Sequence, residues 1–203
     1  MDMTTATALK DMPLPPAPFR SSIMQIEPQW IDYNGHLNMA YYNVMMDRAI
    51  DELWVHLGIG PAYLKERHGS TFTACHVRYL REIHLGDPVQ ISVWLLDADE
   101  KRLHTFEELW HATEGWLSAT SENMTMHIDM NMRKVGPFPP DIRARTQAVA
   151  QAHAAVPRPT ASAEGSRCQV EISPAGRRRR VRPAPGYGSS PAAAACRAAL
   201  PKP

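Results

Sequence analysis

Apolar residues recur at three- and four-residue steps between residues 38 and 57, and this pattern predicts one long amphipathic helix. Asn38 is a suitable N-cap, and Gly58 is a suitable stop at the other end. The apolar positions that would share one face of this helix are Tyr42, Met46, Ala49, Ile50, Leu53 and Leu57.

The chain after this helix alternates apolar and polar residues with a period of two, which predicts strands. The alternating segments are residues 77–83, 89–95, 102–111 and 116–130, with turn residues between them, and residues 23–30 offer a short strand before the helix. This order predicts an α+β fold with an antiparallel sheet of about five strands. A helix about 30 Å long is buried best if the sheet wraps around it, the hot-dog arrangement, although a helix on one open sheet face gives the same order.

The domain organisation follows from where this patterning begins and ends. Residues 1–20 are proline-rich and predict an extended leader, and residues 21–145 carry the patterning of the hot-dog domain. Residues 146–203 are expected to be a linker and an Ala/Pro/Arg-rich tail that is disordered. The arginine run at 177–180 indicates either a solvated tail or a contact with an acidic surface, and a frame shift in the coding sequence would produce a similar composition.

Charge and composition narrow the class of protein. The overall charge of +1 divides unevenly, because residues 158–203 hold nine Lys or Arg against two Glu, a net of +7, which leaves −6 for residues 1–157. The folded part is therefore no basic nucleic-acid binder, and no apolar run reaches the roughly 18 residues of a membrane span. The start lacks the pattern of a secretion signal, so we expect a cytoplasmic protein that binds neither nucleic acid nor membrane. The cysteines show neither disulfide-framework nor zinc spacing, and no metal site is expected.

The densest group of polar residues lies where the first strand meets the long helix. Asp32, Asn34, His36 and Asn38 occur within seven residues, and Gly35 permits a turn that gathers their side chains. The N–H groups at the following helix N-terminus can polarise a carbonyl, and Asp32 can attack that carbonyl or activate water. The alternative is that Asp32 and Asn38 serve only as turn and capping residues.

This run, WIDYNGHLNMAYY, resembles the active-site segment of hot-dog acyl-CoA thioesterases of the 4-hydroxybenzoyl-CoA thioesterase type. The later segments HVRYLREIHLGDPV, LLDADEKRLHTFEELWH and ATSENMTMHIDM resemble those of the betainyl-CoA thioesterases associated with carnitine breakdown, so the similarity covers about residues 22–140. The resemblance implies that Asp32 is the catalytic nucleophile or general base. It also implies that Asn34, Gly35, His36 and Asn38 shape the substrate site.

The same resemblance implies a homodimer or homotetramer with active sites at subunit interfaces. It implies no cofactor, since coenzyme A is part of the substrate. Many such enzymes carry a second polar catalytic group near the strand that follows the helix, where this chain has Cys75 and His76. A structural role is the simpler interpretation of His76, and no feature of the sequence indicates a reactive Cys75.

The sequence therefore predicts a thioesterase that hydrolyses a small acyl-CoA, with betainyl-CoA the first choice. An aromatic or short-chain acyl-CoA is the alternative substrate, and a non-catalytic module that binds an acyl-CoA or a quaternary ammonium ligand is the alternative function. The strand histidines His104, His111 and His127 are expected to be either hydrogen-bonded within the fold or exposed. The apolar row of residues 124, 126, 128 and 130 is expected to fill the core. A trimethylammonium group favours aromatic faces, which several residues offer, although core or interface roles are simpler: Trp30, Tyr33, Tyr41, Tyr42, Trp110 and Trp116.

Overall fold

The computed structural model describes residues 9 and 11–159, and its central element is helix α2, Met39–Leu57. The Asn38 side chain caps this helix by accepting a hydrogen bond from the Ala40 N–H at 3.0 Å. Gly58, with φ of +77°, ends it in the left-handed conformation that glycine adopts without strain. Both predicted ends of the helix are confirmed. Its inward face has no exposed surface at four positions, Met45, Ala49, Leu53 and Leu57.

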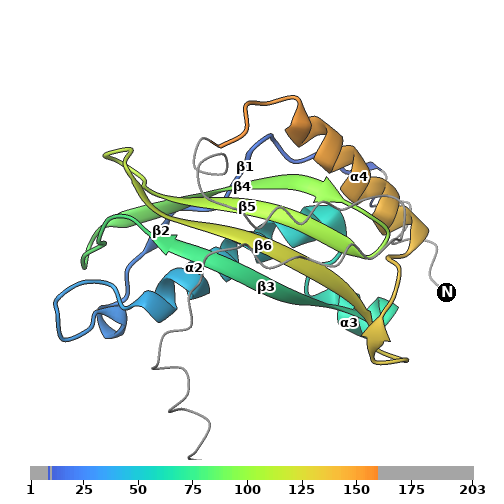
Figure 1. Ribbon diagram of the computed structural model, residues 1–203, viewed down its shortest axis with the longest axis horizontal. Coiled ribbons are helices and arrows are strands. Elements are labelled where there is room, and N and C mark those ends of the chain that lie inside the picture. The colour runs from blue at the N-terminus through green and yellow to red at the C-terminus, as the bar shows by residue number, and fades with distance from the viewer. Residues whose placement is uncertain (1–8, 10, 160–203) are drawn as a thin grey trace, which may run out of the picture. The chain divides into compact units, whose positions relative to one another are not determined.

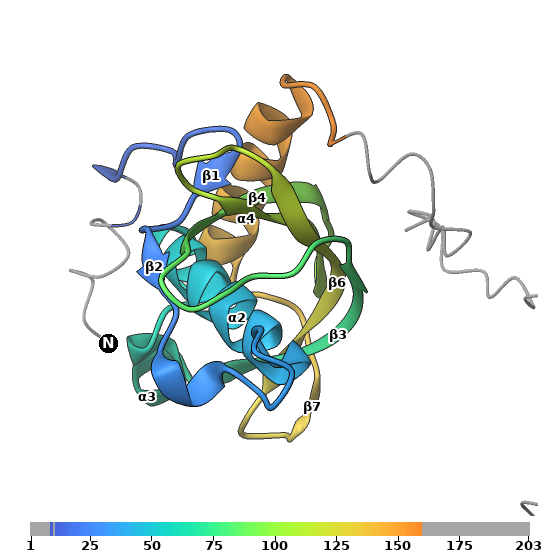
Figure 2. The same cartoon turned by 90° about the vertical axis from the view of Figure 1, so that its left-hand side faces the viewer.

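An antiparallel sheet of seven strands curls around α2, as the end-on view in Figure 2 shows. The strands are β1 (Phe19–Arg20), β2 (Met24–Gln25), β3 (Gly69–Tyr79), β4 (Pro88–Ala98), β5 (Arg102–His111), β6 (Leu117–Asp129) and β7 (Lys134–Val135). The four long strands lie in the order β4, β5, β6, β3, with β1 and β2 on β4 and β7 on β6 (Figure 1). The predicted α+β hot-dog fold is confirmed, and three short strands accompany the four long ones.

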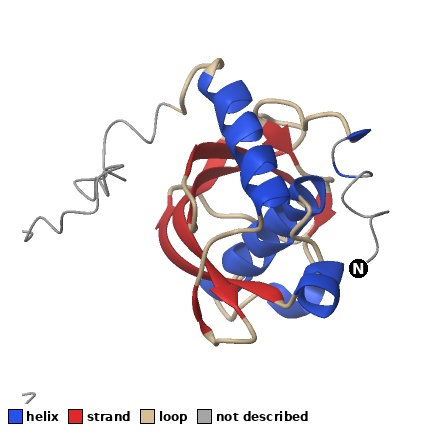
Figure 3. Cartoon of the chain, turned by 90° about the vertical axis from the view of Figure 1, so that its right-hand side faces the viewer, coloured by secondary structure: helices blue, strands red, loops and turns tan. Residues whose placement is uncertain are grey.

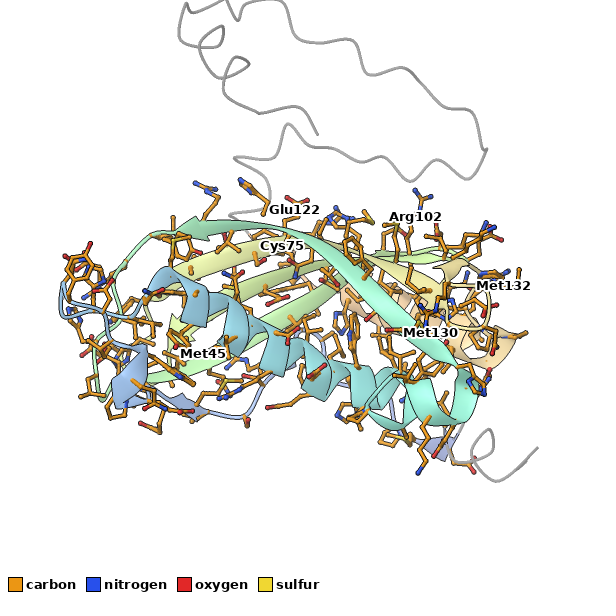
Figure 4. The ribbon with its side chains drawn as sticks, turned by 90° about the horizontal axis from the view of Figure 1, so that it is seen from below. Met45, Cys75, Arg102, Glu122, Met130 and Met132 are labelled. Carbon is orange, nitrogen blue, oxygen red and sulfur yellow. The ribbon has the colours of Figure 1, made fainter. Side chains whose placement is uncertain are left out.

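The expectation that residues 124, 126, 128 and 130 fill the core is wrong. These residues of β6 and the turn after it are only half-buried, whereas the alternate positions are buried and polar: Ser121, Asn123, Thr125 and His127. Figure 4 shows the outer face of the sheet, where Glu122 of β6 and Arg102 of β5 lie on the side away from α2. A period of two separates the two faces of a strand but does not determine which face meets the helix.

The segments on either side of α2 differ from the predicted strand and loop. Residues 23–30 form only the two-residue strand β2 and then the 3-10 helix η1 (Pro28–Trp30), because Pro28 has no N–H to donate to a neighbouring strand. A short helix that the sequence pattern did not predict, α3 (Ala62–Arg67), precedes β3.

The predicted boundary at residue 145 falls inside a helix. Helix α4 (Pro140–Ala154) packs against β4 and runs nine residues past that boundary, so residues 146–154 are helix rather than linker (Figure 3). Part of the predicted leader also packs: Leu9 is buried, and Phe19 pairs with Val93 of β4. The predicted disordered tail from residue 160 onward lies outside the described residues. Within the described part of the chain, every helix is too short or too polar to span a bilayer.

Candidate active site

The residues of the predicted site form one tight loop between η1 and α2. The Asp32 N–H donates to the His36 carbonyl at 3.0 Å, and the Gly35 N–H donates to the Asp32 carbonyl at 3.0 Å. Gly35 has φ of +86°, where a side chain would be strained, so glycine is needed for this turn. The loop therefore brings Asp32, Asn34, Gly35 and His36 together through local hydrogen bonds.

The Asp32 carboxylate is partly buried and is held by one of its two oxygens. Oδ1 accepts a hydrogen bond from the Asn34 N–H at 2.8 Å. No residue in the described part of the chain donates to Oδ2. A role as a turn residue explains the contact of Oδ1. Oδ2 keeps its lone pairs free, and these could attack a carbonyl carbon or take a proton from water.

Helix α2 begins directly after this loop and presents its N-terminal amides there. The Asn38 N–H donates to the Trp30 carbonyl at 2.9 Å, which fixes the start of the helix against η1. The Asn38 side chain satisfies the Ala40 N–H, and no described residue accepts from the Met39 N–H. A free amide at the positive end of a helix is suited to polarise a carbonyl oxygen.

His36 and Leu37 attach the loop to the segment that follows β3. The buried Leu37 donates its N–H to the Ile83 carbonyl at 2.8 Å, and His36 Nε2 lies 3.8 Å from Glu82 Oε1. This second pair attracts only when His36 is protonated. The side chain of Asn34 is exposed, so its predicted role in shaping the substrate site rests on its backbone contact with Asp32.

A cavity of about 360 Å³ lies between α2 and the inner face of strands β3, β5 and β6, lined by both polar and apolar side chains. Cys75 marks the β3 side of this cavity in Figure 4, and its sulfur lies 3.9 Å from Asn43 Oδ1 on α2. Glu107 of β5 lines the same cavity with only 1% of its surface exposed. Burial, with a smaller contribution from the charge of Asp47, raises the pKa of Glu107 to about 8.

Glu107 is not among the functional candidates that the sequence pattern predicts. Its one available signal is that Glu107 shares the face of β5 occupied by Leu103 and Leu109. A carboxylate in an apolar row is uncommon, but the pattern of one strand does not reveal what surrounds it.

Two candidates for a second catalytic group do not join the Asp32 loop. Among the contacts of the described residues, neither Cys75 nor His76 touches a residue of that loop. Cys75 faces the cavity instead, and His76 is exposed on β3. No described residue is therefore assigned as the second catalytic group that the family resemblance suggests.

The buried histidines have structural partners, as the sequence predicted. His127 Nε2 lies 2.8 Å from the Tyr63 hydroxyl, and its Nδ1 lies 3.0 Å from the Gly136 carbonyl oxygen. His111 Nδ1 accepts from the Glu114 N–H at 3.1 Å. In residues 9 and 11–159, no three side chains of His, Cys, Asp or Glu are grouped so that they would hold a metal ion.

Comparison with known proteins places this geometry in a family. Residues 26–146, from just before η1 into α4, match the model of the thioesterase-like superfamily. The chain belongs to the thioesterase-like superfamily. It is a thioester hydrolase, and the family resemblance that the Asp32 motif predicted is confirmed.

Three proteins illustrate what this thioesterase is similar to. It is 37% identical over 133 residues to the betainyl-CoA thioesterase of Pseudomonas aeruginosa, covering 65% of the chain and 84% of that protein. It is 32% identical over 142 residues to the L-carnitine dehydrogenase/betainyl-CoA thioesterase of Rhizobium meliloti, covering 70% of the chain but only 29% of that longer protein. The solved structure of a putative thioesterase from Pseudomonas putida superposes with a TM-score of 0.63 at 29% identity, covering 76% of the chain and 97% of that structure.

Proposed function

We propose that the thioesterase hydrolyses betainyl-CoA to glycine betaine and coenzyme A, with Asp32 as its catalytic carboxylate. The 37% identity to the betainyl-CoA thioesterase of P. aeruginosa carries the choice of acyl group, because that similarity extends over 84% of the relative. The free Oδ2 of Asp32 beside the start of α2 supports the choice of catalytic residue.

Either of two routes uses this carboxylate. As a general base, Asp32 takes a proton from water while the water oxygen attacks the thioester carbonyl carbon, and the C–S bond then breaks to release coenzyme A as its thiolate. As a nucleophile, Asp32 forms a mixed anhydride with the acyl group as the thiolate leaves, and water then hydrolyses the anhydride. In both routes the Met39 N–H and the positive end of the α2 dipole stabilise the oxyanion.

The proposal includes a homodimer, as the family resemblance implies. Strand β3 supports this part, because its eleven residues pair with β6 on one side and with no described strand on the other. Large apolar side chains on and just after the strand are exposed, with Phe72 at 60%, Tyr79 at 43% and Leu80 at 48%. A long unpaired edge with exposed apolar residues suits a second copy of the chain.

The test is the release of free thiol from a panel of CoA esters, comparing wild type with Asp32→Asn. The panel holds betainyl-CoA, benzoyl-CoA and short straight-chain acyl-CoA esters. Asp129→Asn is the matched control, because Asp129 Oδ1 accepts the Asn131 N–H at 2.9 Å in the same turn geometry as Asp32 and Asn34. We expect Asp32→Asn to lose about 10³-fold or more of kcat on betainyl-CoA and Asp129→Asn to stay within about threefold of wild type.

Each result separates the proposal from its alternatives. Turnover of benzoyl-CoA or straight-chain esters alone would retain the mechanism and contradict the choice of betainyl-CoA. Binding of betainyl-CoA without turnover of any ester would favour the non-catalytic module. Full activity of Asp32→Asn, which keeps the Oδ1 acceptor of the turn, would show that Asp32 acts only as a turn residue.

A further inference from the structure

The cavity beneath α2 contains a carboxylate that the proposed chemistry does not use. Glu107 has 1% of its surface exposed, and its Oε1 accepts a hydrogen bond from the Asn123 amide. No residue in the described part of the chain donates to its Oε2, although that atom is fully buried. Burying a polar oxygen without a partner is costly, so Oε2 is available to a polar or charged group that enters the cavity.

Neighbouring side chains fix the direction in which Asn123 presents its amide. Asn123 Oδ1 accepts from the Ser121 hydroxyl at 2.6 Å, and its Nδ2 lies 3.4 Å from the Thr105 hydroxyl. The amide therefore donates to Glu107, and it cannot turn to serve Oε2 without losing the Ser121 bond. The hydrogen bonds among Ser121, Asn123 and Glu107 hold the Glu107 side chain in place, and they leave its Oε2 without a partner.

The charges around the cavity favour a cation. Asp47 of α2 and Glu107 both line it, and neither Lys, Arg nor His is among the described residues that do so. The other titratable group that lines it is the Cys75 thiol of β3, while β6 contributes only hydroxyl and amide groups. A positive group in the cavity would be attracted by Asp47 and would favour the ionised form of Glu107, whose Oε2 it could then approach.

Four of the six aromatic residues suggested for a trimethylammonium group either contact other side chains or are exposed. Trp30 and Tyr41 stack at 5.2 Å between ring centroids, and the Arg48 guanidinium lies over Trp30. Arg81 lies 3.9 Å from the Trp116 ring centroid, and Tyr33 is 97% exposed. No aromatic side chain is among the described residues lining the cavity, so recognition there relies on charge.

The cavity also lies near the start of α2. Asn43 and Asp47 line it one and two turns after Met39, which places them about 6 and 12 Å along the helix axis from that residue. In a compact acyl group such as betaine, the quaternary nitrogen is separated from the carbonyl carbon by one methylene. Its binding site must therefore lie close to a catalytic carboxylate, from the same subunit or from a partner.

We propose that this cavity receives the cationic end of the acyl group, with Glu107 as the carboxylate that selects a quaternary ammonium over a neutral group of the same shape. This inference rests on the proposed function, because it takes the acyl group to be betainyl. A quaternary ammonium donates no N–H hydrogen bond, so its attraction to Oε2 is electrostatic and needs Glu107 to be ionised.

Because the proposed site needs an ionised Glu107, the preference for a cationic acyl group should depend on pH. Burial and the Asp47 charge raise the pKa of Glu107 to about 8, so the empty cavity holds a proton on this carboxyl at neutral pH. A bound cation lowers that pKa and expels the proton. Selection for the cation should therefore strengthen as the pH rises toward 8 and level off above it.

The experiment compares two esters that differ in charge alone. Betainyl-CoA and 3,3-dimethylbutanoyl-CoA have the same shape, because a carbon atom replaces the quaternary nitrogen in the second. In wild type we expect kcat/KM to favour the cationic ester, and Glu107→Gln should reduce this ratio about 10- to 100-fold while leaving hydrolysis of the neutral ester intact. Glu108→Gln is the matched control on the opposite face of β5 and should change the ratio by less than about twofold.

Two further variants, Asp47→Asn and Cys75→Ser, test the role of Glu107 independently. Asp47→Asn should lower the ratio by a smaller factor, because Asp47 is exposed, and it tests the cavity even if Glu107→Gln does not fold. Between about pH 6 and about pH 8.5 the ratio should rise in wild type and in Cys75→Ser, and stay flat in Glu107→Gln. A flat profile in Cys75→Ser would assign the titration to the thiol and overturn the role of Glu107.

Two results would overturn the inference while leaving the thioesterase proposal intact. One is a wild-type ratio near one, and the other is an equal loss on both esters in Glu107→Gln. If wild type hydrolyses neither ester, the choice of acyl group fails. The cation site can then be tested separately by comparing the affinities of glycine betaine and 3,3-dimethylbutanoate in calorimetry. Tighter binding of glycine betaine that Glu107→Gln abolishes would support the site, and equal binding of the two acids would refute it.

Discussion

The guanidinium of Arg145 on α4 donates to the carbonyl oxygen of Met12 at 2.7 Å, joining two residues that lie 133 positions apart in the chain. The same group donates to the Pro13 carbonyl at 2.6 Å and to the His56 carbonyl, at the end of α2, at 3.0 Å. One buried side chain thus fastens the N-terminal segment, the central helix and α4 together.

Replacement of Arg145 by Met should destabilise the thioesterase. The change keeps much of the aliphatic stem but leaves three carbonyl oxygens without their donor, so we expect a loss of about 2–4 kcal/mol in the free energy of unfolding. Urea denaturation followed by circular dichroism measures it. Arg143→Met, at an exposed position of the same helix, should stay within about 0.5 kcal/mol of wild type, and similar losses in both variants would contradict the fastening role.

The capping bond of Asn38 predicts a smaller effect. Asn38→Ala removes the acceptor of the Ala40 N–H and should cost about 1 kcal/mol, whereas Asn38→Asp retains an acceptor and should cost much less. Thermal unfolding of the three proteins at neutral pH compares them. Equal stability of Asn38→Ala and wild type would show that water replaces the cap without loss.

The buried carboxyl of Glu107 predicts that stability depends on pH in a defined direction. Its pKa is about 8 in the folded protein against 4.5 ordinarily, so the folded state retains a proton that the unfolded state releases. This stabilising contribution is complete below about pH 4.5, decreases as the pH rises, and is lost above about pH 8. Relative to Glu107→Gln, wild type should therefore lose stability between about pH 5 and about pH 8 in urea denaturation. A constant difference across that range would mean that Glu107 is ionised throughout.

The ion pair between α3 and α4 predicts the opposite direction. Arg67 donates two hydrogen bonds to Asp141, at 3.0 and 2.9 Å, and this contact holds the pKa of Asp141 below its usual range. The stabilisation is present above the ordinary carboxyl pKa of 3.8 and is lost as the pH falls through the lowered one. Asp141→Asn should cost about 1 kcal/mol at pH 7, since both side chains are partly exposed, and this cost should shrink as the pH falls below 3.8. Equal losses at neutral and at acidic pH would point to a hydrogen bond independent of charge.

Sequence reasoning succeeded where the determining contacts are local. The cap at Asn38, the stop at Gly58 and the turn at Gly35 depend on neighbours within a few residues, so the helix and the Asp32 loop were predictable. The environment of Glu107 was not, because Asp47 and Asn123 approach it from distant parts of the chain. Alternation in β6 likewise gave two faces without showing which one α2 would cover.

Helix α4 shows the same limit from another side. Its buried residues recur at helical spacing, but three of the five are polar: Ile142, Arg145, Thr146, Val149 and His153. A search for apolar periodicity misses such a helix. The polar residues of α4 can be buried because other elements supply their hydrogen-bond partners. One example is the Leu95 N–H of β4, which donates to His153 at 2.9 Å.

The position of Arg145 in the chain bears on how the protein is made. Synthesis runs from the N-terminus, so the segment around Met12 leaves the ribosome long before the α4 residue that holds it. The carbonyl groups of Met12 and Pro13 therefore gain their Arg145 donor only after α4 has been synthesised. Because loop closure opposes contacts between distant residues, we expect this one to form after the local contacts of α2 and the neighbouring strands.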